Sequence, residues 1–272
     1  MNGSDAQSLL DLLGRRPSDI ELDRASLELA RIEDPELDSN RWIAEIDDLA
    51  ARVADRADDL SSGLSFIEAT NRVLFEELRF RGNYADYYNP ANCCLNRVLE
   101  SRLGVPITLS VIYLEIARRL AKPVTGIGLP GHFIVRYDDG ELATFIDPFY
   151  GGTMLDESGC QQLAQVEVLT AEMLAPVDKR HVAMRIVNNL RQVYFSQGDT
   201  GKALRVLDLL IAADPASPDE HKQRAVALVQ EKRGAEALSG FRRYLELAPD
   251  APDREQIEEH MRDISQWIAS RN

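Results

Sequence analysis

The strongest constraint on the fold is segment 106–120, which is apolar around most of a helical circumference. Its only charged residues are Glu115, Arg118 and Arg119. These three share one face, because residues three or four apart in a helix point the same way. Pro106 suits the first helical turn, where a missing N–H costs no hydrogen bond. A helix with so narrow a polar stripe must be covered on nearly every side, so the segment predicts a central, buried helix.

After this helix the pattern changes from helical to extended. The glycine- and proline-rich segment 126–131 cannot continue a helix, and the two apolar runs that follow flank Asp139-Gly140, as in a β-hairpin. This dipeptide favours a two-residue type I′ turn, which places His132 opposite Asp147, whereas a three-residue loop would shift the register by one. Directly opposed residues have Cβ atoms about 5 Å apart. The pattern therefore predicts a hydrogen-bonded His132–Asp147 dyad.

The composition restricts the class of partner. A net charge of −14 argues against nucleic acid, whose binding depends on clustered Lys and Arg. No segment approaches the roughly 20 apolar residues of a membrane span. The first 17 residues also lack the basic start and long apolar middle of a signal peptide. We therefore expect a cytoplasmic protein that has neither nucleic acid nor a membrane as its partner.

The cysteines are Cys93, Cys94 and Cys160, and they form no metal-ligand spacing. We expect no disulfide in a reducing compartment, no metal and no cofactor. The adjacent pair lies near the start of the helix that precedes the central one. Either one of them is a low-pKa thiol directed at His132, or both are small buried residues. The second interpretation is favoured, because free cysteine is among the most buried residue types.

Three motifs surround the predicted dyad. They are N-x-x-L-N-x-V-L-E-x-R-x-G-V-P-I-T-L-S at 92–110, P-G-H-F at 130–133 and F-I-D-P-F-x-G-G at 145–152. Together they resemble the bacterial SirB-type invasion-regulator family over about residues 20–270. The resemblance implies an α+β fold with a helical N-terminal region and a transglutaminase-like, papain-like core that has a small antiparallel sheet. It also implies an α-helical tetratricopeptide-type tail.

The sequence departs from the active pattern at the nucleophile. In transglutaminase-like enzymes the corresponding helix begins Gly-x-Cys, and the thiolate, activated by the histidine and the helix N-terminus, attacks an amide carbonyl. Here the residues are Gly104, Val105 and Pro106, and proline offers no nucleophile. The neighbouring hydroxyls of Thr108 and Ser110 are weak nucleophiles unless a base lies within hydrogen-bond reach.

Two functions remain open. The favoured one is a non-catalytic or regulatory module that binds a protein or peptide partner through the repeats and the remodelled cleft around His132. The alternative is an amide hydrolase or acyl transferase in which His132 is the base, Asp147 orients it and a relocated residue attacks. The candidates for that nucleophile are Thr108, Ser110, Cys93 and Cys94.

Further residues are expected to support the cleft. Asparagine is unfavourable inside a helix without a reason, so Asn92 and Asn96, one turn apart, are expected to hold the loop before Gly104. Segment 84–88 carries three tyrosines, which either wall a ligand cleft or cover the edge of the core, and the second interpretation is favoured. The cleft and support residues are Asn92, Asn96, Gly104, Pro106, Gly131, Phe149, Gly151 and Gly152.

The last third of the chain repeats. An offset of 34 residues relates Ala203 to Ala237 and Pro215 to Pro249, which is the tetratricopeptide period. We expect two helical hairpins and a capping helix, fewer than the three repeats usually needed for independent stability. The predicted domains are a mobile N-terminus at 1–17, a transglutaminase-like core at 18–177 and the repeats with their cap at 178–272.

Overall fold

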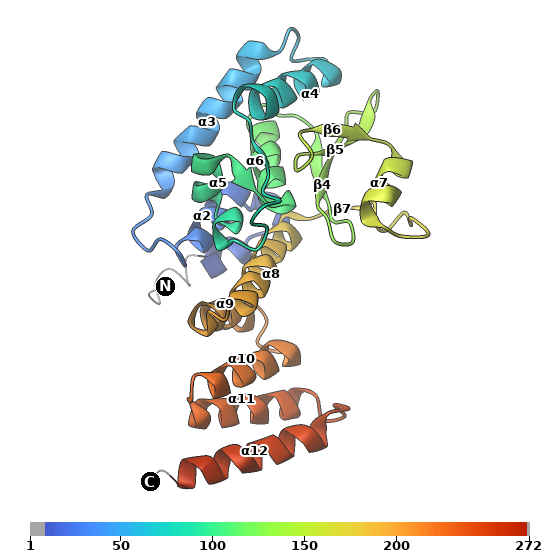
Figure 1. Cartoon of the computed structure of the whole chain (residues 1–272). Coiled ribbons are helices and arrows are strands. Elements are labelled where there is room, and N and C mark those ends of the chain that lie inside the picture. The colour runs from blue at the N-terminus through green and yellow to red at the C-terminus, as the bar shows by residue number, and fades with distance from the viewer. Residues whose placement is uncertain (1–8, 271–272) are drawn as a thin grey trace. The chain divides into compact units, whose positions relative to one another are not determined.

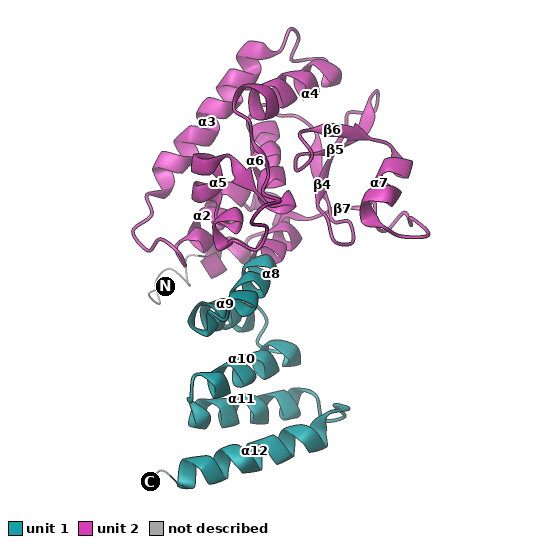
Figure 2. Cartoon of the chain, in the orientation of Figure 1, with its two compact units in different colours: residues 1–6, 187–272 teal, residues 7–186 magenta. Residues whose placement is uncertain are grey.

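The structure, a computed structural model, describes residues 9–270 and divides into two compact units. Of the described residues, the larger unit comprises 9–186 and the smaller comprises 187–270 (Figure 2). Helix α8 (Lys179–Gln197) crosses this division, whereas the sequence placed the boundary just before the helix, between residues 177 and 178.

The predicted mobile N-terminus falls partly on residues 1–8, which lie outside the described residues. Its next part, residues 9–13, is helical, and Leu9, Leu12 and Leu13 are buried. This part is therefore packed, contrary to the expectation. The physical reason is the spacing of the three leucines, which places them on one helical face.

Besides α8 and the helical segment 9–13, the chain contains several further helices, and none within residues 9–270 is long and apolar enough to cross a membrane. In the larger unit they are α2 (Leu22–Ala30), α3 (Ser39–Arg56), α4 (Gly63–Asn71), a π-helical turn (Arg72–Glu77), α5 (Leu95–Ser101), α6 (Pro106–Arg119) and α7 (Glu157–Ala164). Short 3-10 turns occupy Pro17–Asp19 and Pro90–Cys93. The cap of α3 is Asp38, whose side chain accepts from the backbone N–H of Asn40.

Helix α6 is central in the larger unit, as predicted. It begins at Pro106 and packs against α2, α3 and α5 (Figure 1). Every residue from Pro106 to Tyr113 is buried. In its polar stripe Glu115 is buried, at only 1% exposed, and its carboxylate binds Arg118 at 2.7 Å and Arg119 at 2.9 Å, whereas the Arg118 side chain is 39% exposed.

Glu115 belongs to a buried polar cluster that consists of Asp23, Glu115, Arg118 and Arg119 and joins α6 to α2. Glu115 accepts a hydrogen bond from the backbone N–H of Leu22 at 3.2 Å, and Arg119 donates to Asp23 at 2.8 Å. Burial is the largest single influence on Asp23 and raises its pKa, but the hydrogen bond and charge of Arg119, the backbone N–H of Arg24 and the charge of Arg118 together hold the pKa below its ordinary value. Burial, and then the charge of Asp23, raise the pKa of Glu115.

The strands of the larger unit are β1 (Arg81–Gly82), β2 (Leu103–Gly104), β3 (Val124–Ile127), β4 (Ile134–Asp138), β5 (Ala143–Asp147), β6 (Thr153–Leu155) and β7 (Pro176–Val177). Strands β1 and β2 form a short parallel pair, and the others form an antiparallel sheet in the order β6-β5-β4-β3-β7. Figure 1 shows α6 and α7 on opposite sides of this sheet. Cys160 of α7 is part of the apolar cluster between α7 and the sheet, so its thiol is a core group.

The β4–β5 hairpin has a different register from the predicted one. Asp138 pairs with Ala143, so the loop contains four residues, 139–142, instead of two. The Asp139 carboxylate accepts from the backbone N–H groups of Glu141 and Leu142 at 2.9 and 2.8 Å, which stabilises the longer loop. The register shift is two residues, and side chains alternate with a period of two, so each residue keeps its face of the sheet.

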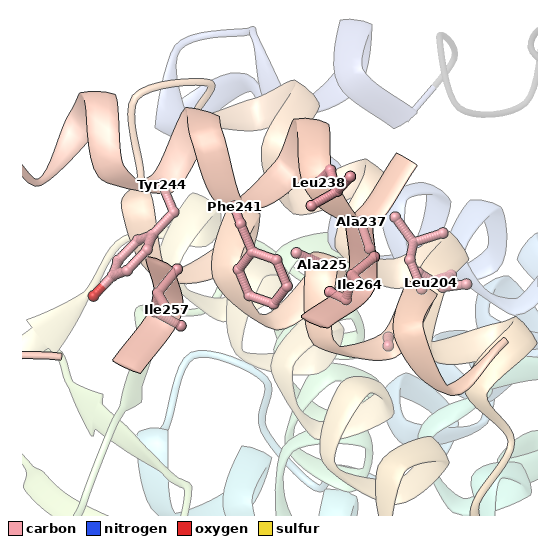
Figure 3. Packing of buried hydrophobic residues seen from close by; sticks show 10 residues of the cluster. Leu204, Ala225, Ala237, Leu238, Phe241, Tyr244, Ile257 and Ile264 are labelled. Atoms are coloured by element: carbon pink, nitrogen blue, oxygen red, sulfur yellow. The ribbon is translucent and has the colours of Figure 1, made fainter. Parts of the chain in front are cut away.

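The smaller unit consists of the end of α8 followed by α9 (Thr200–Ala213), α10 (Pro218–Gln230), α11 (Gly234–Leu247) and α12 (Arg254–Ala269). Successive helices pack against one another, and Figure 3 shows the apolar side chains between them. Ala203 and Ala237, the residues related by the 34-residue offset, are both fully buried. Arg224, at a position usually occupied by leucine in such repeats, instead reaches Asp208 of α9 at 2.6 Å.

Candidate functional site

His132 and Asp147 form the expected hydrogen bond, with His132 Nε2 lying 2.9 Å from Asp147 Oδ2. The Asp147 side chain is 1% exposed and the imidazole 10%. The other carboxylate oxygen, Oδ1, accepts from the backbone N–H groups of Phe149 at 2.9 Å and Tyr150 at 3.3 Å. Asp147 is thus fixed from both sides and orients the imidazole. The second ring nitrogen, Nδ1, makes no hydrogen bond with any residue in 9–270.

His132 and Asp147 come together in a strand register that differs from the predicted one. Asp147 lies level with Ile134 in the sheet, and His132 precedes β4 by two residues. A shift of two residues keeps both side chains on the same face and makes them diagonal neighbours, about 7–8 Å apart at Cα and still within reach of a long side chain. The imidazole therefore still reaches the carboxylate, although the direct cross-strand pairing is wrong.

The turn that carries His132 is held by a residue that the sequence did not indicate. Gly131 has φ of +67°, which favours glycine, and the backbone N–H of His132 donates to Leu129 O at 3.2 Å. Arg185 of α8 donates to Leu129 O at 2.9 Å and to His132 O at 2.6 Å, and its guanidinium lies over the ring of Phe133. Its carbonyl partners lie more than fifty residues earlier in the chain, so no local pattern points to Arg185.

The two candidate hydroxyls are bonded to backbone carbonyls. Thr108 Oγ1 donates to Asn92 O at 2.7 Å and accepts from the backbone N–H of Val105 at 3.2 Å. Ser110 Oγ donates to Phe133 O at 3.4 Å, and both hydroxyls are fully buried. Within residues 9–270, neither hydroxyl is hydrogen-bonded to His132.

The candidate thiols are also buried. Cys93 ends the 3-10 turn Pro90–Cys93, and Cys94 is the residue that precedes α5. Cys93 is 1% exposed, and burial raises the pKa of its thiol to about 12. A low-pKa thiol at Cys93 is therefore wrong, since a buried apolar setting disfavours the thiolate. The favoured interpretation, two small buried residues, fits both cysteines.

Gly104 and Pro106 shape the start of α6. Gly104 pairs with Gly82 in the parallel ladder, and a Cβ on it would come within 3.0 Å of Thr108 Oγ1. Pro106 is buried in the first turn of α6, at the position where the resemblance to transglutaminase-like enzymes leads us to expect a cysteine. The helix N-terminus that would lower a thiol's pKa is therefore present without a thiol.

Asn92 organises the tyrosine-bearing loop. It lies in the 3-10 turn rather than in α5, and its amide donates to the carbonyls of Asp86 at 2.6 Å and Tyr87 at 3.1 Å. Its side chain thus holds the loop at 83–88, not the loop before Gly104 as expected. Asn96 lies in α5 and is buried, and its Oδ1 has no hydrogen-bond partner in the described part of the chain.

The loop after Asp147 depends on glycine. Gly151 and Gly152 have φ of +70° and +76°, a region that other residues rarely adopt. Asn71 Nδ2 donates to Gly152 O at 2.8 Å, and a Cβ on Gly152 would collide with Asn71 Oδ1. Asn71 comes from α4, and no local sequence pattern indicates this contact.

Aromatic rings gather around the dyad and form what we term the aromatic surface, which consists of Tyr84, Tyr87, Phe149, Tyr150 and His132. Ring centroids of Tyr84 and Phe149 are 4.7 Å apart, and those of His132 and Tyr150 are 5.9 Å apart. Tyr84 is 59% exposed and Tyr150 52%, whereas Phe149 is buried beneath them. The tyrosines of segment 84–88 are exposed rather than sealing the core edge, so the favoured expectation for them is wrong.

Other hollows of the larger unit lie away from the dyad. A cavity of about 600 Å³ is lined by β5, β6 and the segment 171–176, and neither His132 nor Asp147 lines it. No three His, Cys, Asp or Glu side chains come together as a potential metal site in residues 9–270. The dyad and the aromatic surface are therefore the candidate site that geometry supports.

Comparison with known proteins agrees with this architecture. A model of the transglutaminase-like superfamily matches residues 40–188, and a tetratricopeptide repeat model matches residues 190–262. A UPF0162 protein of Xylella fastidiosa is 34% identical over 250 residues, which cover 88% of each chain. Human F-box only protein 21 is 37% identical over 160 residues, which are 55% of this chain and 25% of that protein. No solved structure matches the chain.

Fold and site thus define a transglutaminase-like core followed by tetratricopeptide repeats. The SirB1 protein of Salmonella typhimurium is 27% identical over 229 residues, which cover 80% of this chain and 84% of that protein. The chain belongs to the SirB-type family, together with the UPF0162 proteins.

Proposed function

We propose that this protein is a non-catalytic, regulatory module that binds protein partners through a transglutaminase-like core without a nucleophile. The observation that carries the proposal is the environment of His132. Within residues 9–270 its imidazole is hydrogen-bonded to no side chain other than Asp147, and the first turn of α6 holds Pro106. A base without a hydroxyl or thiol in reach has nothing to activate.

The remaining nucleophile candidates support the same conclusion. Thr108 and Ser110 donate their protons to backbone carbonyls, so their hydroxyls stabilise the fold. The Cys93 thiol has a pKa raised to about 12, so almost none of it is thiolate at neutral pH. Each group would have to leave its present bonds or its buried position before it could attack.

Two features support partner binding. Tetratricopeptide repeats are helical arrays whose surfaces bind extended segments of other proteins. The aromatic surface adds exposed tyrosines beside a rigid dyad, and exposed aromatic side chains are enriched where proteins bind one another. The cytoplasmic location expected from the sequence remains part of this proposal.

An electrophilic probe tests the absence of a nucleophile. We expect iodoacetamide at neutral pH to label the folded wild-type protein slowly, and at the same rate in Cys93→Ala, Cys94→Ala and His132→Ala. The rate is measured by intact mass spectrometry. Fast labelling that disappears both in one cysteine variant and in His132→Ala would show a relocated nucleophile and would contradict the proposal.

One observation favours the alternative, an amide hydrolase or acyl transferase. The His132–Asp147 bond is intact, and Nδ1 makes no hydrogen bond to another described residue, so this nitrogen is available to a nucleophile that approaches. The same labelling experiment tests the cysteine form of this alternative, because an enzyme that uses Cys93 or Cys94 requires a thiol whose reactivity depends on His132.

A further inference from the structure

The aromatic surface presents ring faces to solvent. Tyr84, Tyr87 and Tyr150 are exposed, and they pack edge to face or tilted against Phe149 and His132 with centroids 4.7 to 6.2 Å apart. Gly82 lies against the Phe149 ring, with no room for a Cβ, so the base of the surface is closely packed. The rings therefore form a fixed platform rather than a set of independent side chains.

These rings differ from others in the same protein in one respect. Among residues 9–270, lysine or arginine lies over an aromatic ring at seven places, among them Arg102 over Phe80 and Lys222 over Tyr244. Within residues 9–270, none of these cations lies over a ring of Tyr84, Tyr87, Phe149 or Tyr150. The negative faces of these rings are therefore available to a cation from outside.

The part of the chain that contains Phe149 and Tyr150 is acidic. Segment 137–178 carries nine Asp or Glu residues and no Lys or Arg, and Phe149 and Tyr150 lie within it. The Asp147 carboxylate lies directly beneath the platform. A surface with one sign of charge raises the local concentration of ligands of the opposite sign.

Two cations do occur near the platform, and both are accounted for. Arg185 lowers the pKa of Tyr87 against the larger effect of burial, but its guanidinium is bonded to the carbonyls of Leu129 and His132. Arg81 is exposed at the neighbouring position to Gly82, and alternate residues of a strand point to opposite sides, so Arg81 points away from Phe149.

Tyr84 offers the ring of a neutral phenol. Burial, followed by the neighbouring Tyr150 and Asp147, raises the pKa of Tyr84 to about 12. Its hydroxyl therefore stays protonated at neutral pH, and its attraction for a cation comes from the ring and from the acidic surroundings.

We infer that the aromatic surface binds an arginine side chain from a basic segment of a partner protein. Arginine fits better than other cations, because its planar, weakly hydrated guanidinium stacks on aromatic faces. The acidic segment 137–178 attracts the positive charges that flank this arginine. The inference rests on the proposed function and specifies the chemistry of the partner.

The experiment uses the full chain and a pair of synthetic peptides, acetyl-GRGRGRG-amide and the same peptide with citrulline in place of each arginine. Citrulline keeps the size and hydrogen-bonding shape of arginine and removes the charge. Binding is followed by tyrosine fluorescence or calorimetry. We expect saturable binding of the arginine peptide that weakens with added salt, and none of the citrulline peptide in the same concentration range.

Substitution of individual aromatic rings tests whether the arginine peptide binds at the aromatic surface. Tyr84→Leu and Tyr150→Leu are each expected to weaken binding of the arginine peptide about two- to fivefold, the range for a single exposed cation–π contact. Tyr84→Phe and Tyr150→Phe keep the ring and are expected to bind like the wild type. Phe195→Leu, at an exposed ring of the smaller unit, is the matched control.

Three results would overturn the inference. They are equal binding of the two peptides, no saturable binding of the arginine peptide, or unchanged affinity in a correctly folded Tyr84→Leu/Tyr150→Leu double variant. The peptide comparison on wild-type protein decides the question even if a variant does not fold. Mass spectrometry of the recovered protein and peptides separates this failure from that of the proposed function, because only catalysis would change a mass.

Discussion

The two compact units differ in how far along the chain their contacts reach. In the repeat unit, polar contacts join residues close in sequence, such as Arg224 to Asp208 and Tyr244 to Asp253. In the core, Asn71 reaches Gly152 and Arg119 reaches Asp23, across 81 and 96 residues. The structure of the repeat unit can therefore be predicted from local periodicity, whereas the core and its site depend on contacts that only the complete fold brings together.

The largest loss of stability is expected when the two units are expressed as separate fragments. A fragment of residues 180–272 should show no cooperative thermal transition by circular dichroism, because two repeats and a cap bury too little surface. A fragment that ends at residue 197 retains all of α8 and is expected to unfold cooperatively. A cooperative helical transition in the repeat fragment would show that local contacts suffice for its stability.

The next effect comes from the buried polar cluster. Glu115→Ala is expected to lower the free energy of unfolding by about 3 kcal/mol in urea denaturation, because it leaves the backbone N–H of Leu22 and two arginines without this acceptor. This is the lower end of the usual range, since Arg119 keeps Asp23 and Asp47 as partners. Arg224→Ala, which breaks an exposed pair in the repeats, should cost less than about 1 kcal/mol. If Glu115→Ala and Arg224→Ala lowered the free energy of unfolding equally, the two units would not differ in how much their polar contacts contribute to stability.

A smaller effect tests the loop beneath the aromatic surface. Gly152→Ala is expected to lower the free energy of unfolding by about 2 kcal/mol, because it combines a left-handed backbone with a collision against Asn71. Gly140→Ala, also at positive φ but with open space around the added methyl, is the matched control and should cost less. The difference between the two losses of unfolding free energy measures the effect of the collision with Asn71. Similar losses in the two variants would mean that the left-handed backbone alone accounts for the cost of Gly152→Ala.

The smallest expected effect is the change in unfolding free energy with pH. Hydrogen bonds from Lys222 and Tyr244 hold the pKa of Asp253 in the repeats below its ordinary value, so its stabilisation is complete above that ordinary value and is lost as the pH falls through the folded pKa. Asp253→Asn should therefore cost more stability at pH 7 than at pH 3. The sign is opposite for Glu115 of the core, whose raised pKa gives a contribution that is present at low pH and lost as the pH rises through the folded pKa. Denaturation curves at several pH values check both signs.

The tyrosine loop shows where sequence reasoning fails for a site. The sequence shows the aromatic residues of segment 84–88 but not whether they are exposed. Their exposure depends on how Asn92 holds the loop and on where Phe149, about sixty residues later in the chain, packs against it. Arg185 was missed for a related reason. Its partners are backbone carbonyls, which every residue has, so no residue type marks the contact.

The sequence by itself determined the elements that depend on periodicity. The apolar segment that became α6 and the 34-residue offset of the repeats are properties of neighbouring residues, and hydrophobic burial acts on them directly. The tertiary structure decided the hairpin register and the dyad's geometry. A short side-chain turn at Asp139 lengthened the loop by two residues, and His132 reached Asp147 on the diagonal. The physical reason is that local patterns fix which face a side chain occupies, whereas partners distant in sequence are chosen by packing of the whole core.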